Sequence, residues 1–221
     1  MREPSYRLIA LLNGEEDALE LDEAAIEVAA IDHGDLARRA VLRQLDLWAS
    51  RVLSAAGPGA RGAALLHALN HVLFEEEKLA GDRDDYYSPA NSCIDLVMAR
   101  RKGLPITLSV ICIEAGRRAG LRLSGVNLPG HFVCRYDDED GVRVMMDPFD
   151  GGRLLTEEDC LRVVEEITGA RLPPAEPLFA PAPRSRIVAR MLHNLHGAYW
   201  RRGDVDKAAA VAQWLRLASR G

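Results

Sequence analysis

The stretch 101–121, RKGLPITLSVICIEAGRRAGL, predicts a helix with well-marked ends. A short helix over 93–101, capped by Asn91 or Ser92, is expected before it, and Gly103 interrupts that helix. Pro105 suits a first helical turn, because its φ is already helical and its missing N–H would be unpaired there anyway. Gly120 is a typical helix stop. The sequence therefore predicts a helix from Pro105 to about Ala119.

Three strand-like runs follow this helix, at 121–128, 131–137 and 142–149. The acidic turn at 137–141 predicts a hairpin between the last two. Residues 153–155 form a further short run, and Thr156 followed by two glutamates predicts the capped start of another helix. Helical and strand-like runs thus occupy separate stretches, which predicts an α+β core over residues 82–170.

Residues 1–81 predict a helical N-terminal region, rich in alanine from Glu15 onward. Asp35 is placed to cap a long helix. Apolar residues recur in that helix at spacings of three and four, which indicates one buried face, at Leu42, Leu45, Ala49 and Val52. The break at 57–59 separates it from the next helix, which runs over 60–79.

The C-terminal part begins with a proline-rich linker, 171–186, whose composition opposes regular structure. Residues 187–221 predict a helical hairpin that turns at 202–204. Its sequence resembles one tetratricopeptide repeat, with matching spacing at Leu195, Tyr199, Gly203, Asp204 and Ala208. Because one such repeat cannot bury its own apolar face, we expect the hairpin to dock on the rest of the chain.

The composition is that of a globular protein, and its charge excludes some functions. The net charge of −5 disfavours broad nucleic-acid binding, which needs a positive surface. No apolar run reaches the length of a membrane span, and the N-terminal run is too short for a signal peptide. These features predict a cytoplasmic protein with reduced thiols, at Cys93, Cys112, Cys134 and Cys160.

Neither the cysteines nor the histidines predict a metal site. The cysteines form no CxxC pair, and no HExxH pattern accompanies His67 and His71, which stand four residues apart. We expect no metal and no cofactor.

The run 86–155 carries two specific motifs, PGHF at 129–132 and DPFDGG at 147–152. It resembles the SirB family of bacterial transglutaminase-like proteins, and the likeness covers most of the chain. The resemblance implies a transglutaminase-like core related to the papain-like cysteine peptidases, with a helical lead-in and a C-terminal tetratricopeptide-type segment.

The same resemblance assigns candidate site residues. A nucleophilic cysteine at a helix N-terminus, a histidine on one strand and an aspartate on the next form the active site of this superfamily. His131 and Asp147 match the histidine and the aspartate. In active relatives a glycine follows the cysteine by fifteen residues and another precedes it by two. Gly120 and Gly103 then both place Pro105 at the nucleophile position, and proline has no attacking atom.

Ser109 and three cysteines are the alternative nucleophiles that the sequence offers. Ser109 lies one helical turn beyond Pro105 on the same face, about 6 Å deeper, and Cys112 lies roughly 10 Å away. Cys134 points to the other side of the strand from His131. Cys93 reaches His131 only if its helix packs end-on. Each of these side chains is expected to pack or to hydrogen-bond rather than to attack a substrate.

Two functions therefore compete. The first is a non-catalytic pseudoenzyme that binds a peptide or protein partner in a regulatory role, in a cleft with His131, Asp147, Ser109 and Asn91 as binding residues. The second is a hydrolase or acyl-transfer enzyme that uses His131 and Asp147 with Ser109 or a cysteine. The relevant observation is which side chain lies next to the His131 ring. The sequence leaves the partner and the oligomeric state open.

Overall fold

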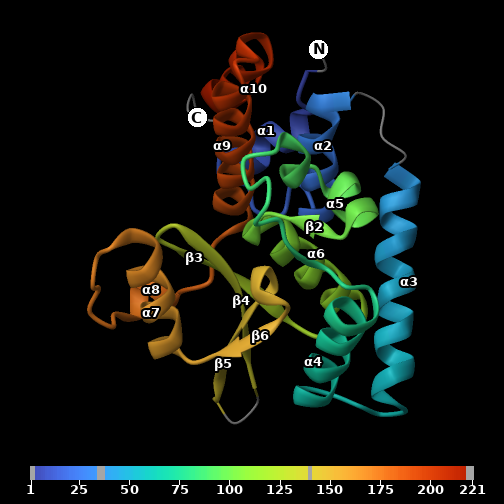
Figure 1. Cartoon of the computed structure of the whole chain (residues 1–221). Helices are drawn as coiled ribbons and strands as arrows, with labels where there is room; N and C mark the ends of the chain where they lie inside the picture. The colour runs from blue at the N-terminus through green and yellow to red at the C-terminus, as the bar shows by residue number, and fades with distance from the viewer. Residues whose placement is uncertain (1–2, 34–37, 139–140, 218–221) are drawn as a thin grey trace.

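The computed structural model describes residues 3–33, 38–138 and 141–217 (Figure 1). Its main sheet is an antiparallel meander in the order β3-β4-β5-β6. The strands are β3 (Leu123–Leu128), β4 (His131–Asp137), β5 (Arg143–Asp147) and β6 (Arg153–Leu155). They lie within the runs that the sequence predicted as strands. The register pairs Cys134 of β4 with Met146 of β5.

Side chains alternate between the two faces of the sheet, as the two-residue period of a strand requires. On one face Phe132 and Cys134 join the main apolar core. On the other face Val126 and Val133 belong to a smaller core, which includes Cys160 and Val164 of the next helix. The sheet therefore separates two apolar layers.

Helix α6 (Pro105–Arg118) runs through the main core. Every residue from Pro105 to Gly116 is buried, and the helix contacts β3 and β4 as well as helices of the N-terminal region. A helix that is apolar on nearly all sides is stable only in such a central position. The predicted helix after Gly103 is confirmed, with Pro105 as its first residue.

The N-terminal region is helical, as predicted. Its elements are α1 (Tyr6–Leu12), α2 (Leu21–His33), α3 (Arg38–Ala56), α4 (Ala63–Asn70) and the π-helical turn η1 (His71–Glu76). In α3 the predicted residues Leu45, Ala49 and Val52 are buried and Leu42 is partly buried, while Val41 and Trp48 are buried as well. Asp35, the predicted cap, lies outside the described residues.

A short parallel pair leads into α6. Strand β1 (Ala80–Gly81) pairs with β2 (Lys102–Gly103), with the 3-10 turn η2 (Pro89–Ser92) and α5 (Ile94–Arg100) between them. The expected cap of α5 by Asn91 or Ser92 is wrong. Cys93 takes the cap position, and its side chain makes no capping bond.

The last helices lie in two places, one pair beside the strands and the other beside α1 and α2 (Figure 1). They are α7 (Glu157–Thr168), α8 (Glu176–Phe179), α9 (Arg184–Arg202) and α10 (Val205–Leu217). The predicted start of α7 is confirmed, since Thr156 and Asp159 form a capping box. Helix α9 packs on α1 and α2, and its apolar side chains belong to the main core. The helical hairpin therefore docks within its own chain.

The proline-rich segment 171–186 contains regular structure, contrary to the prediction, because it includes α8 and the first residues of α9. Phe179 of α8 is fully buried in the smaller core, and Pro181 forms a backbone bridge with Val126 of β3.

Within the described ranges, no helix is both long enough and apolar enough to cross a lipid bilayer.

Candidate functional site

His131 and Asp147 lie side by side at one end of the sheet. His131 is the first residue of β4 and Asp147 the last of β5, so the antiparallel register brings both side chains to the same edge. The Nε2–H of His131 donates to Oδ2 of Asp147 over 2.8 Å, and both residues are at least 95% buried. Because Nε2 is engaged by the carboxylate, chemistry at this ring would use Nδ1.

Asp147 is held in place by the turn that follows it. Its Oδ1 accepts hydrogen bonds from the backbone N–H groups of Phe149 and Asp150, at 3.0 Å and 3.3 Å. The carboxylate thus caps the 3-10 turn η3 (Pro148–Asp150) with one oxygen and orients His131 with the other. Both carboxylate oxygens of Asp147 are therefore engaged within the chain.

The pair borders a cavity of about 630 Å³, here called the His131 cavity. This volume lies in the range of ligand sites in proteins. The lining residues come from the loop before η2, from the start of α6, from the turns around the two strands and from α7. They are Arg83, Tyr86, Tyr87, Pro105, Gly130, His131, Asp147, Phe149, Asp150, Arg153, Val163, Glu166 and Ile167.

Two glycines leave room for the groups that surround the cavity. Gly130 has φ +73° in the turn before His131, where a side chain would be strained, and a Cβ there would also meet Ile167 at 2.7 Å. A Cβ on Gly81 would lie 2.4 Å from the ring of Phe149. Glycine at these positions lets α7 and the Phe149 ring approach closely.

Aromatic rings form much of one side of the cavity. Tyr86 packs edge-to-face on Tyr87 and on Phe149, with centroid separations of 5.2 Å and 5.8 Å. Phe149 packs in the same manner on His131, at 6.1 Å. The guanidinium of Arg83 lies 5.0 Å above the Phe149 ring and pairs with Asp150. The imidazole therefore faces a rigid, partly apolar surface.

The start of α6 contributes Pro105 to this cavity. No cysteine, serine or threonine occurs among the described residues that line it. Ser109 is fully buried and does not line the cavity, and its Oγ–H donates to the carbonyl of Pro105 over 2.8 Å. Such a bond to the carbonyl four residues back is the ordinary role of a serine inside a helix.

The four thiols also lie outside the cavity lining, and all are buried. Burial raises the pKa of the Cys112 thiol well above its usual value. Burial, with a smaller effect from the Asp147 carboxylate, raises the pKa of Cys160 to about 12. A thiol with so high a pKa carries almost no thiolate at neutral pH, and the thiolate is the reactive form.

Asn91 does not line the cavity, which corrects its placement as a binding residue. It is fully buried behind the loop that carries the tyrosines. Its Nδ2 donates to the carbonyls of Asp85 and Tyr86, at 2.8 Å and 3.3 Å, and its Oδ1 accepts from Arg100 at 3.1 Å. Asn91 therefore shapes this wall of the cavity from behind.

Sequence reasoning missed most of the cavity lining. The two adjacent tyrosines in the polar loop 82–92 were an available signal, since paired aromatics are unusual in an exposed loop. Val163, Glu166 and Ile167 of α7 gave no such signal, because their approach depends on how α7 packs on the sheet.

Among the described residues, no group of three or more His, Cys, Asp or Glu is arranged to hold a metal ion.

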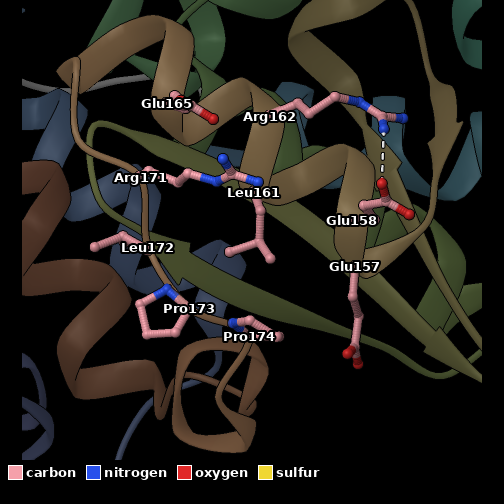
Figure 2. A pocket seen from close by; sticks show the side chains of 9 residues that line it. All are labelled: Glu157, Glu158, Leu161, Arg162, Glu165, Arg171, Leu172, Pro173 and Pro174. Atoms are coloured by element: carbon pink, nitrogen blue, oxygen red, sulfur yellow. Dashed lines mark hydrogen bonds and ion pairs between the residues drawn. The ribbon is translucent and has the colours of Figure 1, made fainter.

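A second hollow, of about 680 Å³, lies between α7 and the segment 171–174. Figure 2 shows its lining, in which Arg162 pairs with Glu158 at 3.1 Å and the leucines come from both walls. Leu161 and Leu172 pack against the smaller core. This hollow holds no counterpart of the His131–Asp147 pair.

Comparison with known proteins places the chain in a family. The family model described as the transglutaminase-like superfamily matches residues 39–193. A UPF0162 protein of Xylella fastidiosa is 43% identical over 148 residues, which cover 66% of this chain and 52% of the relative. A UPF0162 protein of Pseudomonas aeruginosa is 28% identical over 87% of this chain and 70% of its own length.

F-box only protein 21 of Homo sapiens is 31% identical over 59% of this chain, which corresponds to 21% of that protein. The chain spans about half the length of the Xylella fastidiosa relatives. No solved structure matches. The family match extends over more than half of the chain, from α3 into α9, and includes the His131–Asp147 pair. This chain belongs to the transglutaminase-like superfamily.

Proposed function

We propose that this protein is a non-catalytic, SirB-type member of the superfamily that binds a peptide or protein segment in the His131 cavity, in a regulatory role. One observation carries the proposal. Pro105, which has no nucleophilic atom, lines the cavity together with His131. The residues that provide hydroxyls or thiols in the alternative reading, Ser109 and Cys112, point into the core.

The cavity has features that suit a peptide ligand. Its aromatic side offers rigid contact area at a small cost in conformational entropy. The His131–Asp147 pair and the carboxylate of Glu166 offer hydrogen-bonding groups beside it. Apolar walls with a few convergent polar groups are typical of binding sites. The binding residues in this proposal are His131, Asp147, Tyr86, Tyr87 and Phe149.

The α9–α10 hairpin is proposed to be a tetratricopeptide-type unit. Gly203 supports this assignment, since it ends α9 with φ +75° and allows the sharp turn between the helices. The absence of a disulfide bond among the described cysteines supports a cytoplasmic location. The net charge of −5 supports a protein or peptide partner over a nucleic acid.

The second candidate is a hydrolase or acyl-transfer enzyme. The observation in its favour is the oriented imidazole, because a histidine fixed by an aspartate is the usual general base of acyl transfer. It would need an attacking group within about 3–4 Å of the ring. Ser109 would have to give up its bond to the Pro105 carbonyl and leave the core.

The test is a peptide-library selection on the intact chain, followed by fluorescence polarisation with the selected peptides. We expect His131→Ala to weaken binding about tenfold or more, since a buried group that contacts the ligand is lost. His67→Ala is the matched control, because His67 is exposed on α4 and far in sequence from the cavity lining. Hydrolysis or transfer of a peptide amide by purified protein, lost in His131→Ala, would establish the enzyme instead.

A further inference from the structure

The loop that carries the two tyrosines of the His131 cavity makes contacts with side chains of α9 as well as within itself. The guanidinium of Arg201, near the end of α9, lies 4.2 Å above the ring of Tyr87. The next residue, Arg202, forms an ion pair with Asp85, 117 residues away in sequence. Two consecutive residues of α9 thus contact the loop at Asp85 and Tyr87, the residues on either side of Tyr86.

The base of the same loop is fixed from another direction. Asp82 is buried and accepts hydrogen bonds from Arg100 at 2.7 Å and from the N–H of Asp85 at 3.2 Å. Asn91 holds the carbonyls of Asp85 and Tyr86. These contacts end at Tyr86, whereas Tyr87 is 52% exposed and has Arg201 over its ring.

We infer that Arg201 and Arg202 are positioning residues for the His131 cavity, and that helix α9 thereby determines the position of its tyrosine wall, meaning Tyr86 and Tyr87. Arg201 acts through the ring of Tyr87, and Arg202 acts through the carboxylate of Asp85. The inference rests on the proposed function only in taking this cavity as the binding site.

The expected effect is moderate, since both contacts are partly exposed. A cation over an aromatic ring and an exposed ion pair each change an equilibrium by about two- to fivefold. Losing both would therefore lower the population of this wall position, relative to displaced positions of the tyrosines, by about tenfold. Loss of either would leave the main core intact, because α9 is anchored there by other side chains, including Met191 and Leu195.

The test measures access to the cavity without a ligand. In the variant Pro105→Cys, the introduced thiol reports on the cavity, while the native cysteines are buried and report on global unfolding. Mass spectrometry follows alkylation by iodoacetamide at each cysteine. We expect Arg201→Ala to accelerate alkylation at position 105 about two- to fivefold, with no acceleration at Cys112 or Cys160.

Two further variants separate positioning from a general effect of charge. Arg201→Lys retains a cation over the ring and should restore the slower rate. In a Tyr87→Ala background, Arg201→Ala should change the rate by less than about twofold, because the contact is already lost. Arg186→Ala is the matched control, since Arg186 is exposed on α9 and its described contacts include none with the loop.

The inference is overturned if Arg201→Ala and Arg202→Ala label at the unaltered rate, or if Arg201→Ala has the same effect with and without Tyr87. If Pro105→Cys does not fold, Ile167→Cys on α7 replaces it, because Ile167 lines the same cavity and is half exposed. A protein that binds no peptide but shows the Arg201 effect would refute the proposed function and leave this inference standing.

Discussion

Two groups of charged side chains, each with buried members, lie at opposite ends of α6, and the group at its start borders the His131 cavity. At the start of the helix the His131–Asp147 pair adjoins the cavity that Pro105 lines. At its end Arg118 donates to Glu114 at 2.8 Å and also pairs with Asp22 of α2.

The second group, here called the Arg118 cluster, joins three helices. Arg118 also reaches Asp46 of α3 at 2.9 Å, and Arg117 adds a bond to Glu114 at 2.8 Å. Each carboxylate of the cluster has an arginine partner. Buried charge alone therefore does not indicate a functional site. The His131–Asp147 pair is a candidate site because its ring adjoins open space lined by aromatic side chains.

The largest expected effect comes from removing the central cation of the Arg118 cluster. Arg118→Ala would remove the arginine that bonds directly to both buried carboxylates and would leave only Arg117, which bonds to Glu114 but lies 3.9 Å from Asp22. We expect a loss of about 3–5 kcal/mol in the free energy of unfolding, because the buried charge of Asp22 loses its direct partner. Urea denaturation at pH 7 measures it. A loss below about 1 kcal/mol would show that solvent reaches the cluster. The Arg118 cluster would then not differ from the His131–Asp147 pair as a purely structural group.

His131→Ala should cost less, although the side chain of His131 is more buried than that of Arg118. Asp147 keeps its two backbone hydrogen bonds when the imidazole is removed, so its carboxylate is not left without partners. We expect about 1–2 kcal/mol in urea denaturation, together with the loss of peptide binding described above. Destabilisation as large as that of Arg118→Ala would mean that the histidine is structural.

Glu114→Gln should have a still smaller effect at neutral pH. Burial, reinforced by the carboxylate of Asp22, raises the pKa of Glu114 above its usual 4.5 in spite of the arginine hydrogen bonds. A raised carboxyl pKa means that the folded state binds the proton more tightly than the unfolded state. The stability from this group is thus full below pH 4.5 and is lost as pH rises through the folded-state pKa.

A glutamine is neutral at every pH and imitates the protonated form of Glu114. We expect less than about 1 kcal/mol of destabilisation at pH 7 and a flatter dependence of stability on pH above 4.5. Urea titrations between pH 4 and 7, on the variant and the unaltered protein, measure both. A steeper pH dependence in the variant would contradict this account of Glu114.

The smallest effect is expected for a carboxylate at the surface. Hydrogen bonds from the N–H and hydroxyl of Thr156, with a smaller contribution from Arg162, lower the pKa of Asp159 to about 2. A lowered pKa stabilises the fold above pH 3.8, and this contribution is lost as pH falls from 3.8 toward 2.

Asp159→Asn should therefore reduce the acid sensitivity of unfolding between pH 4 and 2, with little change in access to the His131 cavity. Thermal unfolding followed by circular dichroism across that range measures it. Equal acid sensitivity in the two proteins would show that the capping box contributes nothing in solution. A marked change in alkylation at position 105 would instead connect this helix cap to the cavity.

Much of the fold could be predicted because its signals are local. Glycine and proline mark the ends of α6, two-residue alternation marks β4, and Thr156 with Asp159 marks the start of α7. The cap of α5 was predicted wrongly, since Asn91 bonds to the loop carbonyls rather than to the helix. A single polar residue near a helix start has several partners within reach, and packing selects among them.

The sequence by itself determined the order of the elements, the proline that begins α6, and the histidine and aspartate at the ends of two paired strands. These depend on backbone preferences and spacing along the chain. Tertiary structure alone decided that Tyr87 meets Arg201, that α7 closes one side of the cavity, and that Ser109 turns into the core. Contacts between distant segments form only when apolar faces pack together, and no local pattern specifies which faces meet.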